Sequence, residues 1–183
     1  MKRALLAVVG LAMLSLACAT GMGGGPDGDE GGRGPRGYGG ALPADAPRYV
    51  NPGTLAALDG FTHAVKVGFT IYVSGEVPLD STGALVGAGD VAAQAKQAFA
   101  NLGEVLKIAG ARPGDVTKLT IYVVSLKEKD IAAIRSAAGA FLPERNPPAG
   151  TIVGVSSLPR DGVLIAVDAI AVERSLFEPR TGP

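Results

Sequence analysis

The 183-residue chain holds one cysteine, one histidine and no tryptophan. A single cysteine excludes an internal disulfide, a CxxC pair and a zinc site built from several thiolates. A single histidine excludes a site with several histidine ligands within one subunit, and we expect neither a metal site nor a cofactor. Any chemistry must then use carboxylates, hydroxyls, arginine, lysine or backbone groups.

The chain also lacks an excess of either charge, because 17 basic residues balance 17 acidic ones. A protein that binds nucleic acid usually carries a basic surface that neutralises phosphates, so we expect no nucleic-acid partner. The length suffices for one domain with a real core and is too short for two large domains.

The first residues have the pattern of an export signal. Lys2 and Arg3 precede an apolar run of 13 residues, Ala4–Leu16, which is too short to span about 30 Å of hydrocarbon. The run ends at Ser15-Leu16-Ala17-Cys18, which resembles a bacterial lipoprotein box. We therefore predict a signal peptide over residues 1–17 and lipidation of Cys18. The alternative is an ordinary signal peptide cut nearby, which leaves Cys18 discarded or free.

A glycine-rich stretch follows, with 11 glycines among the 20 residues from Gly21 to Gly40. Such a segment has little apolar surface to offset its ordering entropy, which predicts a flexible tether over residues 18–53, irregular to its end. Export and lipidation predict a protein anchored by lipid alone in the bacterial cell envelope, on the periplasmic side of the outer membrane.

The remaining chain predicts one folded domain over residues 54–177 and a short tail over 178–183. Residues 62–67 and 70–74 are β-rich runs joined at Gly68-Phe69, which is typical of a hairpin. Asp90 can cap an amphipathic helix that ends at Gly110. Its apolar residues recur with helical spacing: Ala95, Ala98, Phe99, Leu102, Val105, Leu106 and Ala109.

The second half repeats the alternation of strand and helix. Residues 116–124 form a nearly continuous apolar run, which predicts a strand buried on both faces. A helix ending before Pro143 begins either with a capping box at Ser125–Glu128 or at Asp130. Strands are expected at 151–155 and 163–172. Helices segregated to one side of a mixed sheet give an α+β sandwich.

Short motifs in a fixed order then point to a family. They are Tyr72–Pro78, Gly89–Asp90, Gln94, Asn101–Leu102, Ala109–Ala111, Asp115–Val116, Lys118, Pro148–Thr151, Val155, Leu158–Pro159 and Asp168–Ala171. The ordered set, spanning about residues 59–173, resembles the Rid (YjgF) family of reactive-intermediate deaminases. The resemblance implies a chorismate-mutase-like fold and a homotrimer with ligand clefts between subunits. It also implies hydrolysis of 2-imino acids such as 2-iminobutanoate and 2-iminopropanoate to 2-keto acids and ammonia.

Three positions depart from the family pattern. The family arginine that grips the substrate carboxylate follows Pro-Ala, and here that position is Gly150. The glutamate that assists water corresponds to Ala166, and the tyrosine at the cleft mouth corresponds to Phe61. An arginine fork binds a carboxylate with two hydrogen bonds, so its loss predicts weak or absent deaminase activity.

The resemblance places Phe61, Ser74, Gly75, Gly150 and Thr151 at the cleft. Arg135 lies at a family position that faces the cleft, and is either a relocated anion contact or an ordinary exposed helix residue. Glu76 either orients water or is merely solvated, which makes it, with Arg135, a weak catalytic candidate.

His63 and Asp168 are expected to be structural, with the Asp168 carboxylate accepting from a backbone donor. The preferred hypothesis is a tethered trimer that binds small keto- or imino-acid-like metabolites. The alternatives are an active deaminase with a rearranged site and a structural or holdase trimer.

Overall fold

The computed structural model describes residues 46–174. The predicted signal peptide, Cys18, the glycine-rich stretch and the tail lie outside these residues. The described elements in chain order are β1 (Arg48–Val50), β2 (Ala64–Val67), β3 (Thr70–Glu76), α1 (Val91–Ala109), the 3-10 turn η1 (Pro113–Asp115), β4 (Val116–Val124), α2 (Glu128–Phe141), β5 (Ala149–Val155) and β6 (Ile165–Val172).

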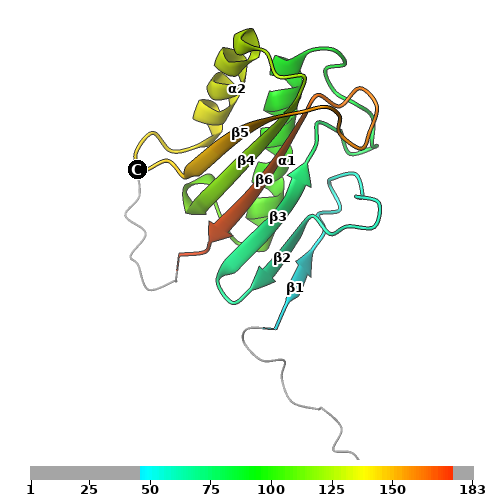
Figure 1. Ribbon diagram of the computed structural model, residues 1–183. Helices are drawn as coiled ribbons and strands as arrows, with labels where there is room; N and C mark the ends of the chain where they lie inside the picture. The colour runs from blue at the N-terminus through cyan, green and yellow to red at the C-terminus, as the bar shows by residue number, and fades with distance from the viewer. Residues whose placement is uncertain (1–45, 175–183) are drawn as a thin grey trace, which may run out of the picture. The chain divides into compact units, whose positions relative to one another are not determined.

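The six strands form one mixed sheet in the order β1-β2-β3-β6-β4-β5. Strands β4 and β5 are parallel, whereas the other neighbouring pairs are antiparallel. Both helices cover the same face of this sheet (Figure 1). α1 packs against β6 and β3, and α2 lies along α1. The α+β sandwich predicted from the sequence is confirmed.

Helix α1 forms where its caps and apolar period predict. The Asp90 carboxylate accepts hydrogen bonds from the backbone N–H groups of Ala92 and Ala93 at 2.9 and 3.1 Å. Gly110 ends the helix with a φ of 93°, a left-handed conformation that favours glycine. The predicted apolar stripe is buried in the core.

The folded sheet begins earlier than expected. Residues Arg48–Val50 lie in the stretch predicted to be irregular, yet they pair with β2 as an edge strand. Val50 is buried in the core. The prediction of an irregular segment is therefore wrong for these three residues, which the sheet edge and the core hold in place.

Two further expectations are corrected. Helix α2 begins at Glu128 with Lys127 as its cap, and Ser125 has a left-handed φ of 50°, so the capping box at Ser125–Glu128 is wrong. Strand β4 alternates between buried and less buried residues. One subunit therefore buries only the β4 face that meets the helices.

The other face of the sheet carries exposed apolar side chains. Tyr49 on β1 lies in register with Val65, which pairs with Tyr72 on β3. Tyr49 and Tyr72 are 68% and 51% exposed. We call this helix-free side, with Tyr49, Tyr72 and Val172 on its strands, the open face. Large apolar groups on one exposed face are characteristic of an interaction surface.

No helix within residues 46–174 is both long and apolar enough to cross a membrane.

Candidate functional site

Five of the predicted site residues fall into two groups at different places on or beside the sheet. The first group consists of Phe61, Ser74 and Gly75, next to Ala166. The second consists of Gly150 and Thr151 on the edge strand β5. Strands β6 and β4 lie between β3 and β5, and three strand spacings amount to about 14 Å. A single subunit therefore does not bring the two groups around one small ligand.

The first group surrounds the end of β3. The Ser74 hydroxyl donates a hydrogen bond to the Thr62 carbonyl oxygen at 2.7 Å, which ties β3 to the loop that carries Phe61. Phe61 itself is 76% exposed. A Cβ atom added at Gly75 would lie 3.8 Å from the Ala166 Cβ atom, so these two positions are in direct contact.

Glu76 follows this group but points into the protein. Its side chain is buried, as is that of His63. The His63 Nδ1 atom lies 3.0 Å from one Glu76 carboxylate oxygen and 3.1 Å from the other. The interpretation of Glu76 as a merely solvated residue is therefore wrong. In this arrangement the carboxylate holds His63 and is turned away from solvent.

The buried pair has shifted proton affinities. The hydrogen bond that His63 donates to the Glu76 carboxylate raises the pKa of His63 above its ordinary value of 6.5. Burial raises the pKa of Glu76 above 4.5, although His63 opposes that shift. The pair fixes the loop between β1 and β2, because His63 Nε2 also lies 3.0 Å from the Ala56 carbonyl oxygen.

The second group contains a cation that the sequence analysis left without a role. The Lys118 ammonium donates to the Thr151 hydroxyl at 3.1 Å across the parallel pair of β4 and β5. Gly150 leaves open space beside it, because an added Cβ atom would meet only the Pro148 carbonyl oxygen, at 4.0 Å. Lys118 lies next to Leu119, the register partner of Gly150. The register of β4 and β5 is therefore the information that would have identified Lys118 as a neighbour of the second group.

Arg135 lies on α2 between buried Ile134 and exposed Ser136, and is itself exposed. Within residues 46–174 its guanidinium has no hydrogen-bond or ion-pair partner. This arrangement agrees with an ordinary exposed helix residue and equally leaves the group available to a ligand.

Asp168 has a different role from the one expected. Its carboxylate accepts a hydrogen bond from the Tyr122 hydroxyl at 2.9 Å, rather than from a backbone donor. The Asp168 carboxylate stabilises the protonated phenol and so raises the pKa of Tyr122. This pair lies on β6 and β4, between the two groups of predicted site residues.

The described residues contain no cluster of three or more histidine, cysteine, aspartate or glutamate side chains that could hold a metal ion. The polar groups of the two groups of site residues are the Ser74 and Thr151 hydroxyls, the neighbouring Lys118 ammonium and backbone amides. Such groups can bind a small carboxylate by hydrogen bonds and by charge.

The sequence of this chain is similar to those of known proteins. Residues 52–173 match the family model described as endoribonuclease L-PSP. A 2-iminobutanoate/2-iminopropanoate deaminase of Salmonella typhimurium is 38% identical over 122 residues, which cover 65% of this chain and 91% of the relative. The rat protein of the same name is 36% identical, over 64% of this chain and 83% of the relative.

A solved structure agrees with these sequence relatives. The crystal structure of the YjgF gene product from Escherichia coli superposes with a TM-score of 0.61 at 34% identity, covering 69% of this chain and 99% of that one. The predicted resemblance is thus confirmed. The family model covers well over half of the chain, which therefore belongs to the Rid (YjgF) family.

Proposed function

We propose that the chain forms a homotrimer whose clefts between subunits bind small 2-keto- or 2-imino-acid-like metabolites, with weak or no imine deaminase activity. Two features support an intersubunit cleft. The predicted site residues form two groups about three strands apart, and the open face exposes Tyr49 and Tyr72. A neighbouring subunit docked on the open face can bring the first group of one copy to the second group of another.

Gly150 is the observation that carries the proposal of weak activity. The relatives' activity needs a group that holds the substrate carboxylate, and glycine offers only its backbone N–H there. Lys118 is nearby, but its ammonium is held by Thr151. A lysine acts as a point charge and cannot reproduce the two parallel hydrogen bonds of a guanidinium. The cleft would then bind a carboxylate loosely and orient it poorly.

An active deaminase is the second candidate, favoured by the 38% identity to the Salmonella protein named 2-iminobutanoate/2-iminopropanoate deaminase. In that case Arg135 supplies the missing cation, since it is exposed and without a partner among the described residues. A structural or holdase trimer is a weaker third candidate, because no separate feature of the described residues favours it.

An imine-hydrolysis assay separates these candidates. An amino-acid oxidase generates 2-iminopropanoate, semicarbazide traps the imine, and the enzyme lowers the rate of trapping. We expect this protein to hydrolyse the imine about 30-fold or more slowly than the Salmonella relative assayed in parallel. The reason is that losing a charge-assisted contact in a dry site costs on the order of 2–5 kcal/mol. A rate equal to the relative's would refute weak activity. Loss of that rate in Arg135→Gln would then establish the second candidate.

We also propose that the trimer is exported and anchored to the bacterial envelope by lipid on Cys18, which lies outside the described residues. The supporting pattern is the basic pair at Lys2 and Arg3, the apolar run of 13 residues and the single cysteine at its end. Cys18→Ser should release the domain from the membrane fraction or block processing. A wild-type protein that is wholly soluble, with unmodified Cys18, would contradict the anchor.

A further inference from the structure

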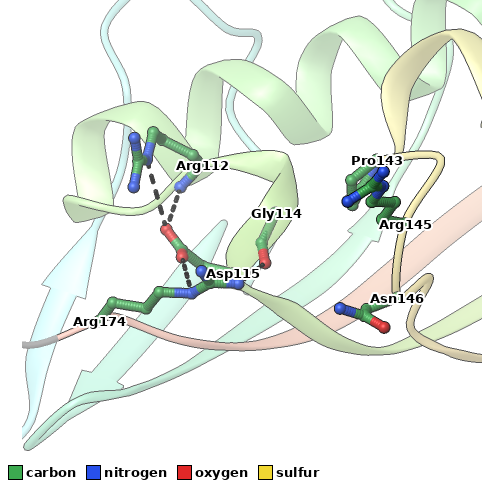
Figure 2. Close-up of a pocket in the computed structure, with 7 residues that line it drawn as sticks. All are labelled: Arg112, Gly114, Asp115, Pro143, Arg145, Asn146 and Arg174. Carbon is green, nitrogen blue, oxygen red and sulfur yellow. Dashed lines mark hydrogen bonds and ion pairs between the residues drawn. The ribbon is translucent and has the colours of Figure 1, made fainter. Parts of the chain in front are cut away.

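A pocket of about 400 Å³ lies outside both groups of predicted site residues. It is formed where η1 leads into β4, where the chain leaves β6, and by the loop between α2 and β5 (Figure 2). Its lining residues are Arg112, Gly114, Asp115, Pro143, Arg145, Asn146 and Arg174. Three guanidinium groups and one carboxylate give this lining a net charge of +2.

Asp115 organises one side of the pocket. Its side chain is only 5% exposed, and one carboxylate oxygen lies 3.3 Å from Arg174 Nε. The other oxygen accepts from the Arg112 backbone N–H at 2.9 Å and lies 3.9 Å from Arg112 Nε. The carboxylate is therefore already paired with the Arg174 side chain and the Arg112 backbone, and this pairing reduces its repulsion of an incoming anion.

The two arginines beside Asp115 keep hydrogen-bond donors for a ligand. Both arginines face the carboxylate through Nε, and one terminal nitrogen of Arg174 donates to the Gly114 carbonyl oxygen at 3.1 Å. Both terminal nitrogens of Arg112 and the other one of Arg174 have no acceptor within the described chain. Terminal guanidinium nitrogens are the groups that bind oxyanions in pairs.

The loop from α2 supplies the other side of the pocket, with Arg145 and Asn146 (Figure 2). Asn146 has a left-handed φ of 54°, a conformation that asparagine tolerates better than most residues. Neither the Arg145 guanidinium nor the Asn146 amide has a side-chain hydrogen bond or ion pair among residues 46–174. Both sides of the pocket therefore offer cationic or amide donors.

We propose that this pocket binds a small organic dianion of the phosphate-monoester class. A phosphate monoester carries a charge of about −1.5 to −2 at neutral pH and three acceptor oxygens, which complement the net charge of +2 and the free guanidinium donors. Small-molecule sites range from about 300 to 1,000 Å³. At 400 Å³ the pocket has room for a short organic group beside the oxyanion.

This site is separate from the proposed cleft. Gly150 is in register with Leu119 inside β4, whereas Asp115 belongs to η1, before β4 begins. The pocket also lies within one subunit. The lining contains none of the predicted cleft residues, so the proposed binding of the dianion does not rest on Gly150 or on deaminase activity.

Titration calorimetry of the full chain with glycerol 3-phosphate, at constant ionic strength and pH 7.5, tests the proposal. We expect saturable binding, with uncharged glycerol giving none. Arg145→Gln and Arg112→Gln should each weaken binding about tenfold or more, because each removes a charge-assisted contact. Lys129→Gln, which removes a helix charge outside the pocket, should leave the affinity unchanged.

Three results would overturn the proposal. They are no saturable binding at millimolar glycerol 3-phosphate, unchanged affinity in both arginine variants, or an equal loss of affinity in Lys129→Gln. Circular dichroism of each variant shows whether it is folded, and the exposed side chains of Arg112 and Arg145 make misfolding an unexpected outcome. Because the readout is binding and not turnover, failure here leaves the imine-hydrolysis test unaffected.

Discussion

The imidazole of His63 is held between two acceptors inside the protein. Its Nδ1 atom lies 3.0 Å from a carboxylate oxygen of Glu76, and its Nε2 atom lies 3.0 Å from the Ala56 carbonyl oxygen. A carbonyl oxygen can only accept, so Nε2 carries a hydrogen. A second hydrogen on Nδ1 then gives a buried ion pair, and both side chains are at most 4% exposed.

Removing either partner of this pair should have unequal effects. His63→Ala leaves the Glu76 carboxylate buried without its partner, and we expect a loss of about 3–5 kcal/mol in the free energy of unfolding. Glu76→Gln keeps the shape and lets the amide donate to a neutral imidazole, so it should cost less than about 1.5 kcal/mol. Urea unfolding measures both values. Equal losses in the two variants would contradict a buried charged pair.

The pair also predicts a pH dependence. The raised pKa of His63 means that its stabilising effect is fully present below its ordinary value of 6.5 and is lost as pH rises through the raised folded-state value. The pKa of Glu76 is raised above 4.5 as well, and this acts in the same direction. The unfolding free energy of the wild type, relative to Glu76→Gln, should therefore fall as pH rises from 6 towards 9. A difference that is constant or increases with pH would refute this linkage.

Gly150→Arg should supply a guanidinium group that binds the carboxylate of a ligand. An arginine side chain can extend from this position because an added Cβ atom meets only the Pro148 carbonyl oxygen, at 4.0 Å. We expect 2-keto acids to bind about tenfold or more tightly, as measured by calorimetry. Gly150→Gln is the matched control, since it adds a side chain without the charge. Equal gains in both variants would show that bulk, and not charge, improves binding.

Gly150→Arg alone should recover little hydrolysis of the imine. Ala166 is 5% exposed, so Ala166→Glu places a carboxylate in a nearly buried position and should cost stability by itself. Combined with Gly150→Arg, it should raise the hydrolysis rate by more than the product of the two single effects, because residues that act as one unit are not additive. If the hydrolysis rate of the double variant equals the product of the two single effects, the two positions do not act as one unit.

The open face should be the subunit interface. Tyr72→Glu introduces a charge into a surface that the proposed trimer buries, and light scattering should then show monomers where the wild type is a trimer. Ile108→Glu is the control, because Ile108 is 49% exposed on α1, which covers the opposite face of the sheet (Figure 1). A monomeric wild type at micromolar concentration, or an intact trimer in Tyr72→Glu, would remove the intersubunit cleft.

The family, the fold class and most elements could be predicted from the sequence. The α1 stripe, its Asp90 and Gly110 caps and the hairpin at Gly68 all depend on neighbours within a few residues, so local pattern suffices. Strand β1 was missed because three residues carry too little alternation. Its place is decided by pairing with β2 and by burial of Val50 in the core.

The candidate site was only partly predictable. The motifs supplied candidate residues for it, but did not indicate that Ser74 and Gly150 lie on strands separated by β6 and β4. They also gave no role to Lys118, whose contact with Thr151 depends on the register of two parallel strands. Residue spacing along the chain carries no information about which strands become neighbours.

The sequence by itself determined the residue types available for chemistry, including the glycine at position 150. Only the tertiary structure decided that Glu76 is buried against His63 rather than solvated, and that Asp115 joins Arg174 from 59 positions further along the chain. The reason is physical. The proton affinity of a carboxylate and the direction of a guanidinium are set by burial and by partners in space, and folding chooses those partners from distant parts of the chain.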